Sequence, residues 1–142
     1  MKALMFGWEF PPHILGGLGT ASFGLTKGIV ENGDMDITFV IPKPWGDEPK
    51  EYAKIIGANT TPVVWRDVNW DHVQSRIGNV MDPQLYYDLR NHIYSDFNYL
   101  HTNDLGCIEF SGRYPDNLLE ELNNYSIVAG VIARTVDFDV IH

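Results

Sequence analysis

A pair of glycines near the start of the chain, Gly16-Gly17, is the clearest chemical signal in the sequence. It belongs to the segment 5–20, which is typical of a strand end, a proline-stiffened turn, a glycine loop and a helix start. Because glycine has no Cβ, the pair is predicted to adopt positive φ angles and to let its N–H groups approach a ligand closely. The amino end of the following helix would attract a phosphate or another anion. A plain strand-to-helix turn explains the same residues equally well.

The loop does not match the common phosphate-binding fingerprints. The dinucleotide pattern needs a later glycine, and the Walker loop needs a lysine followed by serine or threonine. A nucleotide-dependent oxidoreductase is therefore disfavoured, and we expect no cofactor. The sequence contains no evident metal-ligand cluster, nucleophile elbow or closely spaced carboxylate pair, so no metal is expected either.

Three further polar residues are candidates for the same site. Glu9 and His13 lie in the loop itself, and each either bonds a sugar hydroxyl or holds the loop's own backbone. His142 ends the sequence after an apolar run, and it is either a site residue or an ordinary terminal residue. Aromatic residues such as Trp45 either stack on sugars or pack in the core.

Composition excludes several classes of protein. The 142 residues, 44% of them hydrophobic, fit one folded domain. A formal charge of −9 argues against nucleic-acid binding, which needs a basic face. No apolar run is long enough to span a membrane, and Glu9 with Pro11-Pro12 interrupts the run that a signal peptide would need. The single cysteine, Cys107, permits no internal disulfide, so we expect a cytoplasmic protein.

The elements that must position these residues follow from apolar patterning. A continuous apolar run at 2–8 predicts a strand buried on both faces. A helix is predicted from Thr20, its N-cap, to Asn32, with Ala21, Leu25 and Ile29 on its inner face and with Gly24 and Gly28 allowing close approach to the sheet. A second strand is predicted at 36–41. Strand, helix and strand in this order form a βαβ unit.

The pattern is less regular from Pro44 to Tyr114, which we interpret as an elaboration of one domain covering 1–142. A short strand is predicted at 63–65 and a helix after Asp82-Pro83. A long helix capped by Asp116 then runs to Val136, and a buried parallel strand follows at 138–142. Its inner face is predicted to comprise Leu118, Leu122, Tyr125, Ala129, Ile132 and Val136.

These elements predict an α/β fold, a Rossmann-like three-layer domain with a mostly parallel sheet. In a doubly wound order the first and last strands are neighbours, and ligands bind where their carboxyl ends meet. His142 is then expected near the glycine loop. The outer edge of such a sheet is left unpaired, which predicts cover by a homodimer.

The segments 2–19 and 139–142 together resemble glycogen and starch synthases and their retaining glycosyltransferase relatives. Those enzymes begin with a strand, a Glu-x-x-Pro turn and a Lys-x-Gly-Gly-Leu loop, and a later Asp-Val-(Val/Ile)-His motif is matched by Asp139-Val140-Ile141-His142. The resemblance implies the GT-B architecture, in which two Rossmann-like domains face each other. It identifies this chain as the first part of the N-terminal domain.

The resemblance also implies roles for individual residues. Gly16, Gly17 and Leu18 match the loop that reaches the donor's phosphate and sugar. Glu9 matches the acidic residue before the turn, and His142 matches the first histidine of the second motif. The family's loop lysine is replaced by Ile14, which leaves the donor open. No catalytic residue of the family falls within the chain, so this piece alone is expected to be inactive.

The implied reaction transfers glucose from ADP- or UDP-glucose to an α-glucan, with no nucleic acid or membrane as partner. A flavodoxin-like binding module without catalytic activity is the alternative. The two differ in whether the coding sequence continues beyond His142 into the remaining family motifs.

Overall fold

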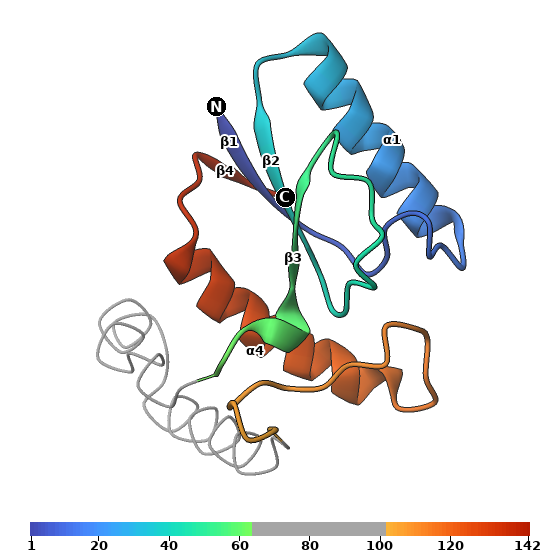
Figure 1. Ribbon diagram of the computed structural model, residues 1–142, viewed down its shortest axis with the longest axis vertical. Coiled ribbons are helices and arrows are strands. Elements are labelled where there is room, and N and C mark those ends of the chain that lie inside the picture. The colour runs from blue at the N-terminus through green and yellow to red at the C-terminus, as the bar shows by residue number, and fades with distance from the viewer. Residues whose placement is uncertain (64–101) are drawn as a thin grey trace, which may run out of the picture.

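The computed structural model describes residues 1–63 and 102–142, which form a parallel sheet with helices packed on it (Figure 1). In chain order its elements are β1 (Lys2–Phe6), α1 (Gly17–Asn32), β2 (Asp36–Ile41), β3 (Lys54–Gly57), the 3-10 helix η1 (Ala58–Thr60), α4 (Leu118–Thr135) and β4 (Val140–Ile141). The strand order is β3-β2-β1-β4, and every pairing is parallel. The predicted Rossmann-like α/β fold is confirmed.

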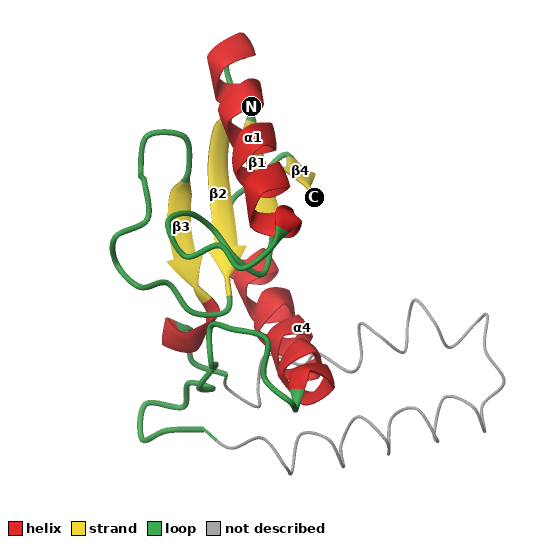
Figure 2. Ribbon diagram, turned by 90° about the vertical axis from the view of Figure 1, so that its right-hand side faces the viewer, coloured by secondary structure: helices red, strands yellow, loops and turns green. Residues whose placement is uncertain are grey.

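β1 lies at the centre of the sheet, and Figure 2 shows the strands beside it. It pairs with β2 from Lys2–Asp36 to Phe6–Val40, and with β4 through Ala3–Val140 and Leu4–Ile141. The expectation that the first and last strands are neighbours is therefore confirmed. Because the strands are parallel, the loops that follow β1 and β2 and the residue that follows β4, His142, lie at the same edge of the sheet.

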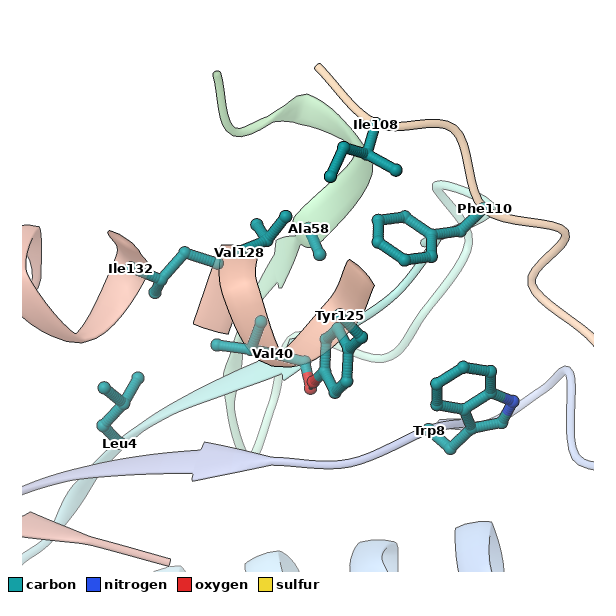
Figure 3. Packing of buried hydrophobic residues seen from close by; sticks show 9 residues of the cluster. All are labelled: Leu4, Trp8, Val40, Ala58, Ile108, Phe110, Tyr125, Val128 and Ile132. Atoms are coloured by element: carbon teal, nitrogen blue, oxygen red, sulfur yellow. The ribbon is translucent and has the colours of Figure 1, made fainter. Parts of the chain in front are cut away.

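One face of the sheet packs against α4. Leu4 of β1 and Val40 of β2 are fully buried against Tyr125, Val128 and Ile132 of the helix (Figure 3). The Tyr125 hydroxyl also donates a hydrogen bond to the Val40 carbonyl at 2.8 Å. Burial raises the pKa of Tyr125 well above its usual value. This contact fixes α4 against the central strands.

The opposite face packs against α1. Ala3, Met5 and Phe39 point to this side, and Phe10 joins them from the loop after β1. The Phe10 ring meets Phe23 of α1 edge-on, with 5.6 Å between the ring centroids. Alternate residues of β1 thus face different helices, which is why the strand reads as a continuous apolar run.

The predicted inner face of α1 is wrong in part. Phe23, Thr26 and Val30 lie toward the sheet, whereas Ala21 and Leu25 are exposed. The helix is oriented by the aromatic contact of Phe23 with Phe10, which the spacing of small aliphatic residues did not reveal.

The glycines inside α1 also differ from expectation. A Cβ at Gly24 or Gly28 would meet no atom within 4 Å, so neither glycine serves close packing on the sheet. The structure gives no other reason for them.

Both helix starts differ from prediction. α1 begins at Gly17, with Gly16 rather than Thr20 as its N-cap. α4 begins at Leu118, with Asn117 rather than Asp116 as its N-cap and without a side-chain capping bond. The buried Glu9 carboxylate, which accepts the Leu15 and Gly19 N–H groups as described below, explains the early start of α1.

The later elements also depart from expectation. On α4, Tyr125 and Ile132 are buried as predicted, but Leu122 is 43% exposed because Glu121 and Val128 lie inward. β4 is parallel as predicted, yet it is only two residues long and exposed, since no strand covers its outer side in the described part of the chain.

β3 was not predicted, because its four residues end in a glycine and resemble a loop. The helix predicted after Asp82 and most of the strand predicted at 63–65 lie outside the described residues.

Candidate functional site

The candidate site is the edge of the sheet where β1, β2 and β4 end. The loop 7–16 leaves β1 here, the loop 42–49 leaves β2, and His142 follows β4. The segment 109–117, which leads into α4, reaches the same edge, because the Trp8 indole N–H donates to the Arg113 carbonyl at 3.0 Å. This is the edge at which parallel α/β sheets bind ligands.

Glu9 holds the glycine loop from inside. Its carboxylate, only 6% exposed, accepts the Leu15 N–H at 2.8 Å and the Gly19 N–H at 3.0 Å. Gly19 is the third residue of α1, so Glu9 performs the task of an N-cap side chain that Gly16 lacks. Of the two roles left open for Glu9, the structure supports the structural one.

Gly19 is the glycine that this arrangement requires. A Cβ there would lie 2.8 Å from Glu9 Cγ, closer than real Cβ atoms approach, and 3.1 Å from Ile14 Cγ1, which is a tight contact. Only a residue without a Cβ lets the carboxylate reach the amino end of the helix. Sequence reasoning placed the importance on Gly16 and Gly17 and missed Gly19.

Gly16 and Gly17 do not have the positive φ angles predicted for them. Gly16 has φ −152° and ψ −172°, which is extended backbone, and Gly17 is already helical. Both are exposed, and a Cβ at Gly17 would meet nothing within 4 Å. The N–H groups of Gly17 and Leu18 have no acceptor among the described residues, so they remain open to a ligand.

His13 joins the loop after β1 to the loop after β2. Its Nε2 lies 2.8 and 3.1 Å from the two carboxylate oxygens of Asp47. Its ring centroid is 5.0 Å from that of Trp45. His13 thus joins two loops through side chains, a role that differs from both of those predicted for it, a bond to a sugar hydroxyl or to the backbone of its own loop.

The loop after β2 is held in the same way as the glycine loop. The buried Glu48 carboxylate accepts the Trp45 N–H at 2.6 Å and the Gly46 N–H at 3.0 Å. Gly46 has φ +96°, a conformation that favours glycine. Trp45 itself is 43% exposed, so it is not a core residue.

The segment before α4 is the third to be held by a buried carboxylate. Glu121 accepts the Ser111 N–H and the Ser111 hydroxyl, both at 3.0 Å. Tyr114, three residues after Ser111, lies close to Glu9. Burial and the negative charge of Glu9 raise the pKa of Tyr114.

His142 is placed at the site by its backbone. Its N–H donates to the Leu4 carbonyl at 2.9 Å, and its own carbonyl accepts the Phe6 N–H at 2.9 Å. The residue thus continues the pairing of β4 with β1 up to the point where the loop 7–16 begins. No hydrogen bond of its exposed side chain to the glycine loop occurs among the described residues.

The structure therefore brings most predicted site residues to one edge. Four residues that sequence reasoning did not propose lie there too: Lys43, Asp47, Arg113 and Tyr114. The position of Lys43 directly after a buried strand and Pro42 was an available signal. Within residues 1–63 and 102–142, no three potential metal ligands come together, and no helix is both long and apolar enough to cross a membrane.

Comparison with known proteins gives a limited match. No protein-family model matches the chain, and neither does any solved structure. The chain is 42% identical over 60 residues to an uncharacterized glycosyltransferase of Methanocaldococcus jannaschii. That match covers 42% of this chain and 14% of the relative, so the chain corresponds to a small part of that protein. A region of this chain is thus similar to part of a glycosyltransferase.

Proposed function

We propose that this chain is the N-terminal Rossmann-like part of a retaining glycosyltransferase of glycogen or starch synthase type, with the GT-B architecture. One observation carries the proposal. The segments 2–19 and 139–142 carry the family resemblance, and they contain the neighbouring strands β1 and β4. The Phe6 N–H donates a hydrogen bond to the His142 carbonyl at 2.9 Å. The similarity to the archaeal glycosyltransferase supports the broader class.

The proposed reaction moves glucose from ADP- or UDP-glucose to the non-reducing end of an α-glucan. The bond between the anomeric carbon and the diphosphate oxygen breaks, and a bond from that carbon to an acceptor hydroxyl oxygen forms. The hydroxyl proton passes to the leaving nucleoside diphosphate, on which negative charge builds up. The open N–H groups of Gly17 and Leu18, at the amino end of α1, suit that charge. Glu9 acts as a positioning residue that fixes the loop. The remaining catalytic groups belong to parts of the enzyme beyond this chain.

A non-catalytic binding module is the second candidate. It is favoured by the position of Glu9, because a carboxylate at the amino end of α1 already uses one helix donor and repels anions. Such a module would bind a small neutral ligand at the same edge without turnover. A homodimer, formed over the exposed outer side of β4, is compatible with either candidate and is tested by light scattering.

An NMR titration of the ¹⁵N-labelled chain tests the site. Maltopentaose is expected to shift the amides of Gly16–Gly19 and of His142, whereas ADP- and UDP-glucose should bind no tighter than the millimolar range because their main site lies outside the chain. Gly17→Val should abolish the sugar-induced shifts while leaving the fold intact, since its side chain enters open space. Gly24→Ala on the exposed face of α1 is the control.

Two outcomes would contradict the proposal. One is a glucan titration that leaves the loop amides unmoved, and the other is micromolar binding of a nucleotide-glucose by this chain. In the complete protein that carries the chain, Gly17→Val should abolish glucosyl transfer, and full activity of that variant would refute the role of the loop.

A further inference from the structure

Two cations converge on one tryptophan at the candidate site. Lys43 Nζ lies 5.0 Å from the ring centroid of Trp45, and Arg113 Cζ lies 5.9 Å from it. The two basic residues come from different segments, the loop after β2 and the segment before α4. We refer to Lys43, Trp45 and Arg113 as the cation–tryptophan cluster. Both cations are within the range of a favourable cation–π contact.

The two cations of the cluster have no ion-pair partner within residues 1–63 and 102–142. The ion pairs among the described residues involve Lys2, His13 and Lys27, but neither Lys43 nor Arg113. Ammonium and guanidinium groups donate hydrogen bonds and accept none, so their natural ligand is an oxyanion. Two like charges beside one ring also repel, and a bound anion would relieve that repulsion.

The backbone beneath the cluster is firmly held. Gly112 has φ +69°, and a Cβ there would lie 3.2 Å from Lys43 Cβ and 3.5 Å from Trp45 Cζ2. The segment before α4 is thus packed directly against the loop after β2. Glu48 and Glu121 fix the two segments by their hydrogen bonds to Trp45 and Ser111. A ligand would therefore meet cations on a preformed frame, which reduces the entropic cost of binding.

Nearby negative groups set the net field. Asp47 pairs with His13, whose ring lies 5.0 Å from Trp45, and the buried Glu48 carboxylate bonds the Trp45 N–H. Glu9 lies close to Tyr114, the residue that follows Arg113. These carboxylates weaken the attraction for an anion, so a weak, salt-sensitive affinity is expected rather than a tight one.

We propose that the cation–tryptophan cluster binds the phosphate group of a small ligand. Arg113 offers the planar donor fork that matches phosphate oxygens, and Lys43 adds a point charge. The same phosphate chemistry is presented by a nucleotide diphosphate and by a phosphorylated sugar. Phosphate binding is inferred from the cluster alone, whereas a role of that binding in glucosyl transfer rests on the proposed function.

Titration of the chain with inorganic phosphate, followed by ¹⁵N NMR, tests the proposal. Saturable shifts are expected at residues 43, 45 and 113. Lys43→Met and Arg113→Gln should each raise the Kd about threefold to tenfold, because each removes one charge-assisted contact. The matched controls are Lys54→Met at the start of β3 and Arg134→Gln at the end of α4, both exposed and distant from this edge. They should leave the Kd unchanged.

The variant Asp47→Asn distinguishes an electrostatic effect on phosphate binding from a structural one. Removing this carboxylate should lower the Kd about twofold to threefold, whereas a variant that merely loosens the loops would raise it. Circular dichroism melting of each variant verifies the fold.

Titrations with UDP and with glucose 6-phosphate identify the source of the phosphate. The cluster serves a nucleotide if UDP binds tighter than phosphate, and a phosphorylated sugar if glucose 6-phosphate does. Non-saturable shifts, or equal effects of cluster and control variants, would overturn the proposal. Phosphate binding as described, combined with a complete protein that transfers no glucose, would leave this site standing and remove the proposed function.

Discussion

Replacing Gly19 by alanine should destabilise the fold far more than replacing Gly17, although the two glycines are two residues apart in the same helix. The new Cβ at position 19 would lie 2.8 Å from Glu9 Cγ, so the glutamate must move. It is held there by two hydrogen bonds of 2.8 and 3.0 Å, and charged hydrogen bonds of this kind each contribute about 1.5–3 kcal/mol. Displacing the glutamate is therefore expected to cost about 2–4 kcal/mol.

Gly17→Ala is the matched control. Its Cβ would meet nothing within 4 Å, and the position is helical. The free energy of unfolding should change by less than about 0.5 kcal/mol, on the stabilising side because alanine restricts the unfolded chain. Urea unfolding, monitored by tryptophan fluorescence and by circular dichroism, measures both variants. For Gly19→Ala the midpoint should fall by about 1–2 M if the slope is near 2 kcal/mol/M.

A double-mutant cycle assigns the loss to Glu9. If the new methyl group acts by displacing the carboxylate, Gly19→Ala should cost much less in a Glu9→Ala background than in the native chain. Equal stability of the Gly19 and Gly17 variants, or full additivity with Glu9→Ala, would refute the steric reasoning.

Two further predictions concern buried polar groups. Glu9→Gln should lower the free energy of unfolding by about 1–3 kcal/mol, because an amide offers one oxygen to two N–H donors. The control, Glu109→Gln on an exposed side chain, should change that free energy by less than about 0.5 kcal/mol. A Glu9→Gln variant as stable as the native chain would contradict the capping role. Burial raises the pKa of Tyr125 above 10.0, so the folded state keeps a proton that the unfolded state loses, and stability should fall as the pH rises above about 10. Tyr125→Phe should lose about 1 kcal/mol of unfolding free energy at neutral pH, because the hydrogen bond to Val40 is removed. In urea titrations at high pH, its unfolding free energy should decline less steeply than that of the native chain. An equally steep decline would exclude Tyr125 as the source.

The layers could be predicted from the sequence, because β1 and β2 are apolar runs, and such runs are typical of parallel strands buried between two layers of helices. The pairing of β1 with β4 could be predicted only by assuming the strand order of a doubly wound sheet. β3 could not be predicted, since Lys54–Gly57 is too short for a periodic signal.

The site was predictable only where its residues are adjacent in sequence. The sequence identified Glu9 but left two roles open, and its hydrogen bonds to the Leu15 and Gly19 amides support the structural role. The meeting of Lys43 with Arg113 depends on how the segment before α4 folds over the loop after β2. Such contacts between distant segments leave no pattern in a single sequence.

The manner in which the loops are anchored has a consequence for how such a site diversifies. Glu9 and Glu48 grip main-chain amides, at positions 15, 19, 45 and 46, and make no demand on the side chains that project from Leu15 or Trp45. Substitution at those two positions can redraw the surface that greets a ligand while the path of the chain stays the same. The backbone conformation of the loops and their ligand specificity therefore depend on different residues, so relatives that share these glutamates need not share a substrate.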